Sequence, residues 1–297
     1  MSDIKINSKA TKMADYRTVD LSQFAVPLDV DEKAAEEQLI KYITRYSETA
    51  KCDSIEKRDL VELSCRSEAP RYNKEDLKIR VGLGLMGRDF ENQLIGLKKG
   101  EIRSLVVSDK KVEVSIREIT REILPKVDDD FAKRCGIPGV STAADLENYC
   151  LIPLLDEELD EPADNASAYL GGHVFDASEF VLDENEISME YDETVKQLAD
   201  RIPGDKIKEF AGQISKSTVK AAAYGQKLLE DSGRLLTGAD YEEHIEKRAV
   251  ARECSTEDMK KEEPAVLYAI HEYSDTVLSL FETYATLQVI KYGREEK

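Results

Sequence analysis

The sequence of 297 residues predicts an α+β protein, in which a small domain of antiparallel strands is inserted into an elongated, all-helical domain. Apolar and polar residues alternate in 61–65 and again in 77–81, as expected of strands with one buried face. After Pro125 the alternation stops, and apolar residues recur every three or four positions, as in amphipathic helices. This separation of strands from helices along the chain is the α+β pattern.

Four segments follow one another along the chain. Residues 1–15 are polar and are expected to form a disordered N-terminus. In residues 16–54, an extended segment leads into a linker helix over 31–50, which has an acidic first turn and one apolar face. That face is expected to pack on the helical body formed by residues 123–297.

Residues 55–122 form the predicted strand domain. A glycine-rich turn, GLGLMG, precedes a short helix with the sequence DFENQLIGL. The runs IRSLVV and KVEVSIREI are separated by Ser108, Asp109 and Lys110, which predicts a tight antiparallel hairpin. In the helical body, residues 156–165 are interpreted as a solvated acidic stretch or a loop, and the region 182–233 as two amphipathic helices.

Charge and composition exclude several classes of function. The formal net charge is −19, so contacts with nucleic acid or anionic lipid, which require clustered Lys and Arg, are not expected. No apolar run approaches the roughly 20 residues of a membrane span, and the first residues lack the apolar core of a secretory signal, so a cytoplasmic location is predicted. The five cysteines are scattered, which indicates reduced structural thiols.

No catalytic constellation is evident. The three histidines show no paired ligand spacing, GLGLMG is not followed by Lys and Ser or Thr, and no Ser or Cys occupies a GxSxG frame. We therefore predict no catalytic residue, no metal site and no cofactor.

Two segments resemble a known family. The first, GLGLMGRDFENQLIGLKKGE, resembles the signature of FKBP-type peptidyl-prolyl isomerase domains, through Phe90, Glu91, Gly96, Lys98, Gly100 and Glu101. The second, REILPKVDDDFAKRCGI, resembles the junction that follows this domain in bacterial trigger factors, through Leu124, Pro125, Asp130, Phe131 and Gly136. The resemblance implies an FKBP-like domain within a trigger-factor C-terminal-type helical body with arms. It also implies that the family's N-terminal ribosome-binding domain is lacking, so no ribosome docking is expected.

An FKBP-type site needs an aromatic-lined apolar pocket for proline. Here the family's aromatic positions align with Cys65 and Val112, its Val/Ile-Pro-Gly element is replaced by Gly87, Arg88 and Asp89, and its flap is reduced to the Ser108–Asp109 turn. The residual pocket consists of Cys65, Met86, Phe90 and Val112. Because the aromatic walls are missing, the resemblance implies a degenerate domain with weak or no isomerase activity.

The predicted function is that of an ATP-independent holding chaperone for unfolded or nascent polypeptides. Its client-binding surface is expected to comprise apolar residues of the helical body: Phe210, Ile214, Tyr224, Tyr268, Ile270, Tyr273, Phe281 and Tyr284. For each of them, burial in the core between helices is the competing interpretation. Two other functions stay open, an active FKBP-type isomerase and a dedicated interaction module for one partner, and so does the oligomeric state.

Overall fold

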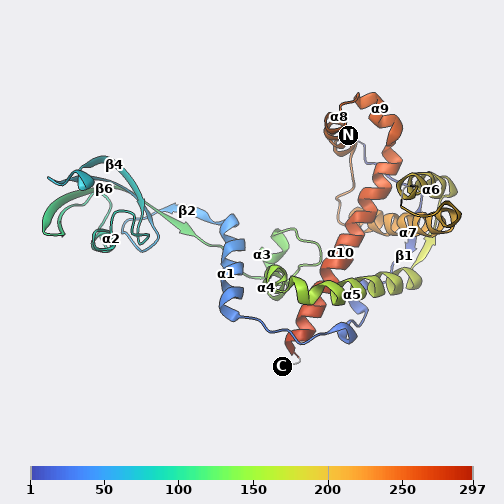
Figure 1. The fold of residues 1–297 in the computed structure, drawn as a ribbon, viewed down its shortest axis with the longest axis horizontal. Coiled ribbons are helices and arrows are strands. Elements are labelled where there is room, and N and C mark those ends of the chain that lie inside the picture. Colours follow the sequence, from blue (N-terminus) through green and yellow to red (C-terminus); the bar gives the residue numbers. More distant parts are fainter. Residues whose placement is uncertain (1, 200, 296–297) are drawn as a thin grey trace. The chain divides into compact units, whose positions relative to one another are not determined.

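The computed structural model describes residues 2–199 and 201–295, and all their side chains except that of Asp205. The chain divides into two compact units (Figure 1). Residues 33–131 form the sheet unit, and the residues up to Glu32 together with those from Ala132 onward form the helical unit. Because the helical unit is built from two segments that are separated in the sequence, the sheet unit is an insertion. The combination of an antiparallel sheet with a separate helical unit confirms the predicted α+β class.

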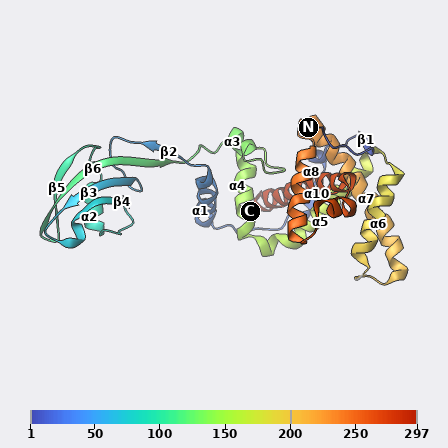
Figure 2. The same ribbon diagram turned by 90° about the horizontal axis from the view of Figure 1, so that it is seen from above.

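The sheet unit is built on an antiparallel sheet with α2 (Arg88–Leu94) packed against it (Figure 2). Its strands are β2 (Glu48–Lys51), β3 (Leu60–Arg66), β4 (Lys74–Arg80), β5 (Ile102–Val107) and β6 (Lys110–Ile123). The long strand β6 pairs with β2, β3 and β5, and β4 pairs with β3. The strand β6 therefore holds the sheet together.

The predicted hairpin is confirmed as β5 and β6. Their connection is the two-residue turn Ser108–Asp109, in which both residues have positive φ angles, 49° and 63°. A turn with two left-handed residues matches the right-handed twist of paired strands, and Asp tolerates this conformation better than most residues do. Alternate residues Leu105 and Val107 of β5 are buried, as the apolar pattern requires.

The linker helix is shorter than predicted. The helix α1 spans Glu32–Ile43 and is followed by a 3-10 turn, Thr44–Tyr46, and by β2. Residues 48–51 pair with residues 120–123 of β6, so backbone pairing overrides the helical pattern that the sequence shows up to residue 50. Residues 33–54 thus belong to the sheet unit, and their predicted packing on the helical body stays a prediction.

The helical unit is organised around α10 (Ala265–Glu295), drawn in red in Figure 1. It packs against α4 (Ala143–Leu151), α5 (Asp156–Ala177), α6 (Glu184–Leu198) and α7 (Gly204–Asp231). The remaining helices are α3 (Asp129–Arg134), α8 (Gly238–Ala251) and α9 (Thr256–Glu262), and the boundary between the two units falls within α3. Short 3-10 turns cover Tyr16–Thr18, Ser22–Phe24, Pro70–Tyr72 and Ile152–Leu154. In the described part of the chain, no helix combines the length and the apolar character that crossing a membrane requires.

Residues 156–165 begin α5, so the loop interpretation is wrong, whereas the acidic side chains of this stretch are exposed, as the interpretation of a solvated stretch requires. Asp156, Glu157 and Glu158 lie in its first turn, where the positive end of the helix dipole favours carboxylates. Leu159 and Ala163 are buried at helical spacing, and Pro162 is accommodated inside the helix. Burial of this apolar face outweighs the local cost of proline.

The prediction of a disordered N-terminus is also wrong for the described residues of 1–15. The strand β1 (Lys9–Lys12) pairs antiparallel with β7 (Glu179–Val181), and Ile6 and Ser8 are buried. Side chains of the helices bind the backbone of this segment directly. Gln226 accepts from the Ile6 N–H at 2.7 Å and donates to the Ile6 carbonyl, and Glu186 accepts from the N–H groups of Asn7 and Ser8 at 2.6 and 2.9 Å. The order of this segment could not be predicted from the sequence, because polar side chains of distant helices hold it and such partners leave no periodic pattern.

The helices α7 and α10 approach closely at Gly225. A Cβ added there would overlap the Tyr273 carbonyl oxygen, whereas a Cβ on the exposed Gly212 of the same helix would meet nothing within 4 Å. We expect Gly225→Ala to lower the free energy of unfolding by about 2 kcal/mol through overpacking. Gly212→Ala, the matched control, should raise it by roughly 0.5 to 1 kcal/mol. Urea unfolding measures both, and equal effects of the two variants would contradict the close packing.

Candidate functional site

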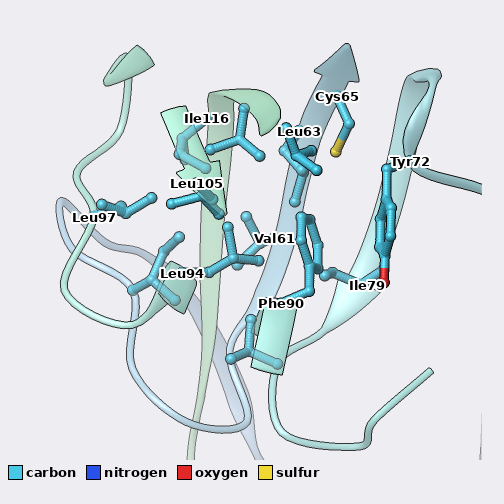
Figure 3. Packing of buried hydrophobic residues seen from close by; sticks show 14 of the residues in the cluster. Val61, Leu63, Cys65, Tyr72, Ile79, Phe90, Leu94, Leu97, Leu105 and Ile116 are labelled. Atoms are coloured by element: carbon cyan, nitrogen blue, oxygen red, sulfur yellow. The ribbon is translucent and has the colours of Figure 1, made fainter. Parts of the chain in front are cut away.

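The predicted FKBP-like pocket residues lie in the core of the sheet unit. Cys65, Phe90 and Val112 are at most 1% exposed, and Met86 packs against the same core half-buried. Figure 3 shows Cys65 and Phe90 among the apolar side chains of the strands and α2. The structure thus gathers these residues, but three of them are core and have no exposed surface to offer to a proline.

Tyr72 is an aromatic residue of this region that the sequence analysis missed. Figure 3 shows its ring beside that of Phe90, and the two ring centroids lie 5.4 Å apart. The Tyr72 hydroxyl donates to the Met86 carbonyl at 3.3 Å. The one local signal for its position in the sequence is Pro70, which starts the 3-10 turn Pro70–Tyr72. Burial raises the pKa of the Cys65 thiol to about 11, so this cysteine stays protonated and unreactive.

The glycine-rich loop, residues 82–87, is organised by one buried carboxylate. Glu91 is fully buried at the start of α2 and accepts from the N–H groups of Gly82, Gly84 and Met86 at 2.8, 2.7 and 3.0 Å. Burial alone would raise the pKa of Glu91, but these backbone donors outweigh burial and lower it. The match of Glu91 to the FKBP signature therefore corresponds here to a structural role in the loop.

Glu91→Gln should destabilise the sheet unit, because the amide replaces a charged acceptor of three N–H groups. We expect a loss of about 2 kcal/mol at neutral pH. Since the folded pKa of Glu91 lies below its usual 4.5, the stabilisation is complete above pH 4.5 and is lost as the pH falls through the folded value. Unfolding of the variant should therefore depend less on pH below 4.5. Exposed Glu113→Gln is the control, and equal acid sensitivity of wild type and Glu91→Gln would contradict this role.

Most of the predicted client-binding residues are buried in the helical unit. Tyr224, Tyr268, Ile270, Tyr273 and Phe281 are at most 4% exposed, so the prediction of an exposed surface is wrong for these five. The Tyr273 hydroxyl donates to the Ile4 carbonyl at 2.6 Å, and the Tyr224 hydroxyl donates to the Ala14 carbonyl at 2.8 Å. These two tyrosines bind the N-terminal segment instead. Tyr284 is half-buried, with its ring edge-to-face on Tyr16 at 4.9 Å.

Phe210 and Ile214 are exposed, at 43% and 41%. They lie one turn apart on α7, toward the end where α7 meets α6. Here the buried positions are small or polar, namely Thr194, Ala211 and Ser215. The larger apolar side chains are half-buried or exposed: Tyr191, Val195, Leu198, Ile202, Ile207, Phe210 and Ile214. We call these seven the α6–α7 apolar face. Amphipathic helices normally show the reverse pattern, so this face is a candidate binding surface.

A cavity of about 530 Å³ lies between α6, α8, α9 and α10, but its lining is ionic. Glu263 contacts Arg248 at 3.4 Å and His244 at 3.1 Å, and Glu262 contacts Arg252 at 2.8 Å. Because these groups already pair with one another, the cavity suits an apolar peptide less well than the α6–α7 apolar face does.

Net charge is concentrated in one unit. The sheet unit contains 20 Lys and Arg and 20 Asp and Glu, so the full net charge of −19 lies on the helical unit. The α6–α7 apolar face thus belongs to the unit that carries the negative net charge, which favours solubility.

A small antiparallel unit inserted into a helical unit is the arrangement that the resemblance to trigger factors implied. The comparison with curated proteins agrees, and the predicted resemblance is confirmed: the chain is similar to trigger factors. The trigger factor of Borrelia turicatae is 26% identical over 266 residues, covering 80% of this chain and 59% of the relative. That of Pelotomaculum thermopropionicum is 26% identical over 211 residues, covering 64% and 46%.

The trigger factor of Mycoplasma mycoides is 23% identical and covers 66% of this chain and 50% of the relative. The chain thus spans about half the length of the curated relatives it matches. No protein-family model matches it. A solved structure, described as that of the trigger factor chaperone, is 16% identical and covers 91% of this chain and 72% of its own, with a TM-score of 0.29, which is too low to bear on the fold.

Proposed function

We propose that the chain is an ATP-independent holding chaperone, which binds unfolded or partly folded polypeptides in the cytoplasm through the α6–α7 apolar face. The observation that carries this proposal is the exposure of Phe210 and Ile214 beside buried small and polar residues. The similarity to trigger factors supports it.

Binding at this face needs no covalent chemistry. An unfolded segment that covers the half-exposed side chains removes apolar surface from water, and this contributes roughly 25 cal/mol per Å² on each partner. Part of each side chain already packs on the helices, so the remaining gain is modest and release is fast. Reversible holding without nucleotide follows from this balance.

The proposal places this activity away from the ribosome. RNA carries a dense negative charge, and a helical unit with a net charge of −19 is repelled by it at physiological salt. The same charge disfavours adhesion to anionic membranes.

The double variant Phe210→Ser, Ile214→Ser tests the face. Each substitution removes a partly exposed apolar side chain worth roughly 1 kcal/mol of binding, so the double variant should lose about 2 kcal/mol, and about thirtyfold more chaperone should be needed for half-suppression of client aggregation. Light scattering of an aggregating client measures this. Val250→Ser on α8, where Val250 is 81% exposed, is the control and should leave suppression unchanged. Equal suppression by wild type and the double variant would refute the proposed face.

The isomerase alternative is tested on the same preparation with an unstructured X-Pro peptide. Because Cys65, Phe90 and Val112 are buried core, we expect no acceleration of cis/trans interconversion over the uncatalysed rate. Acceleration that is lost in Met86→Ala would instead assign a working pocket to the sheet unit.

A further inference from the structure

A buried carboxylate on α6 depends on a histidine for its counter-charge. The side chain of Glu190 is 6% exposed, and its Oε2 lies 2.8 Å from Nε2 of His271 on α10. Its other oxygen accepts from the hydroxyl of buried Thr194 at 3.3 Å. Among the described residues, Glu190 forms no ion pair with Lys or Arg. Burying a carboxylate is costly unless a cation compensates it, so the charge on His271 decides how stable Glu190 is in this place.

The other ionic groups around His271 compensate one another. His271 lines the ionic cavity described above, and the other charged residues of that cavity form ion pairs: Lys196 with Glu193, Arg252 with Glu262, and Arg248 with Glu263. On α10 itself, Asp275 lies one turn after His271 and adds a weaker negative charge. The helix α7 packs against this part of α10 through uncharged residues, Val219, Ala222 and Ala223. The strongest partner of His271 is therefore Glu190.

A second histidine beside the cavity shows the contrast. Oε1 of Glu263 lies 3.1 Å from Nε2 of His244, and its Oε2 lies 3.4 Å from Nε of Arg248. Arginine keeps its charge at every physiological pH, so Glu263 is compensated even when His244 is neutral. Glu190 has no such second cation, and its compensation changes with pH.

The pH range follows from the pair itself. The hydrogen bond to Glu190 raises the pKa of His271 above its usual 6.5, and burial opposes this. Because the folded value lies above the unfolded one, the stabilisation is complete below pH 6.5 and is lost as the pH rises through the folded value. His271 then gives its proton to water, and Glu190 stays buried without a cation. Since α6 packs chiefly on α7 and only slightly on α10, separation from α10 is the simplest way to hydrate Glu190.

We propose that His271 and Glu190 form a pH-sensitive latch between α10 and α6. Protonated His271 holds α6 against α10. When His271 is neutral, α6 separates from α10 beside Glu190, and the cavity between α6, α8, α9 and α10 opens. Its buried apolar lining, Met259 and Leu267, 1% and 5% exposed in the closed state, then becomes accessible. This lining adds to the surface that binds clients, so client binding strengthens as the pH rises. The last step rests on the proposed holding function, whereas the latch does not.

Methyl NMR of isotopically labelled methionine tests the latch in the full chain. Met259 lines the cavity, Met189 precedes Glu190 on α6, and Met86 of the sheet unit is an internal control. The measured quantity is the relaxation that a soluble paramagnetic agent causes, followed from about pH 6 to about pH 8.5, a range that spans histidine titration. Relaxation of the Met259 methyl should rise severalfold, and that of Met86 should stay constant. An unchanged Met259 signal would overturn the latch.

Two substitutions at the latch should act in opposite directions. His271→Gln removes the cation and leaves Glu190 charged, so the Met259 methyl should be accessible at both ends of the pH range. Glu190→Gln removes the buried charge, so this methyl should stay protected at both ends. A pair with a merely structural role would give the same response in both variants, and that result would overturn the proposal.

Two further variants are controls. His244→Gln and His173→Gln, on an exposed histidine of α5, should keep the transition of the wild type. They also keep the test valid if His271→Gln does not fold, because the transition must then be lost in Glu190→Gln and kept in both controls. Loss of the transition in His244→Gln would assign it to the other histidine and overturn the latch.

Light scattering of an aggregating client on the same preparations tests the link to holding. At about pH 6, His271→Gln should suppress aggregation severalfold better than the wild type, and at about pH 8.5 Glu190→Gln should suppress it severalfold less well. Equal suppression by all three chains, with the methyl transition present, would overturn the link between the latch and clients. A methyl transition without suppression at any pH would instead leave the latch intact and contradict the holding function.

Discussion

In the helical unit, side chains of the helices form hydrogen bonds with the backbone of the N-terminal segment. The rest of this unit depends on these bonds. Residues 4–14 pass along α6, α7 and α10, and only β1 pairs with another strand. Buried N–H and carbonyl groups outside such pairing must find other partners. Glu186, Gln226, Tyr224 and Tyr273 supply them, from three different helices. This segment therefore joins helices that would otherwise meet only through their own packing.

That constraint decides which aromatic residues are left to bind clients. Tyr224 and Tyr273 are committed to the N-terminal segment, and Phe281 lies between Phe175 and Tyr224 with centroid distances of 5.8 and 5.9 Å. The N-terminal segment packs at residues 219–226 of α7 and leaves the part of α7 around Phe210 uncovered. Small and polar residues are buried there, so the larger side chains stay accessible. The proposed holding surface is thus exposed because the N-terminal segment covers residues 219–226 of α7 and does not extend to Phe210.

The sequence predicted those features that local patterns determine. The β5–β6 hairpin was predictable because its apolar alternation and its two-residue turn lie side by side in the chain, and α6 and α7 because their apolar stripes repeat over many turns. The strand β2 was missed because its pairing with β6 is a long-range contact that overrides a helical pattern. The N-terminal segment was missed because polar side chains hold it, and such partners leave no periodic signal. For the candidate site, the sequence identified Phe210 and Ile214 but could not separate them from Tyr273, which has similar chemistry and is buried.

The resemblance to FKBP-type domains identified the sheet unit but misled about its residues. Phe90 and Glu91 match the signature of FKBP-type domains, yet Phe90 is core and Glu91 fixes a loop. The aromatic that packs on Phe90, Tyr72, comes from a 3-10 turn that no motif marked. Whether these residues line an open pocket depends on which side chains pack against them, and the sequence motif does not specify those neighbours.

The central claim is that clients contact the helical unit at the α6–α7 apolar face. Its most direct test is photo-crosslinking, with a photoreactive phenylalanine analogue placed at position 210 and, as a control, at position 250, and an unfolded client protein added in excess. We expect client adducts at position 210 that a competing unfolded polypeptide suppresses, and none at position 250. Equal adducts at both positions, or none at 210 under conditions in which the chain suppresses aggregation, would contradict it.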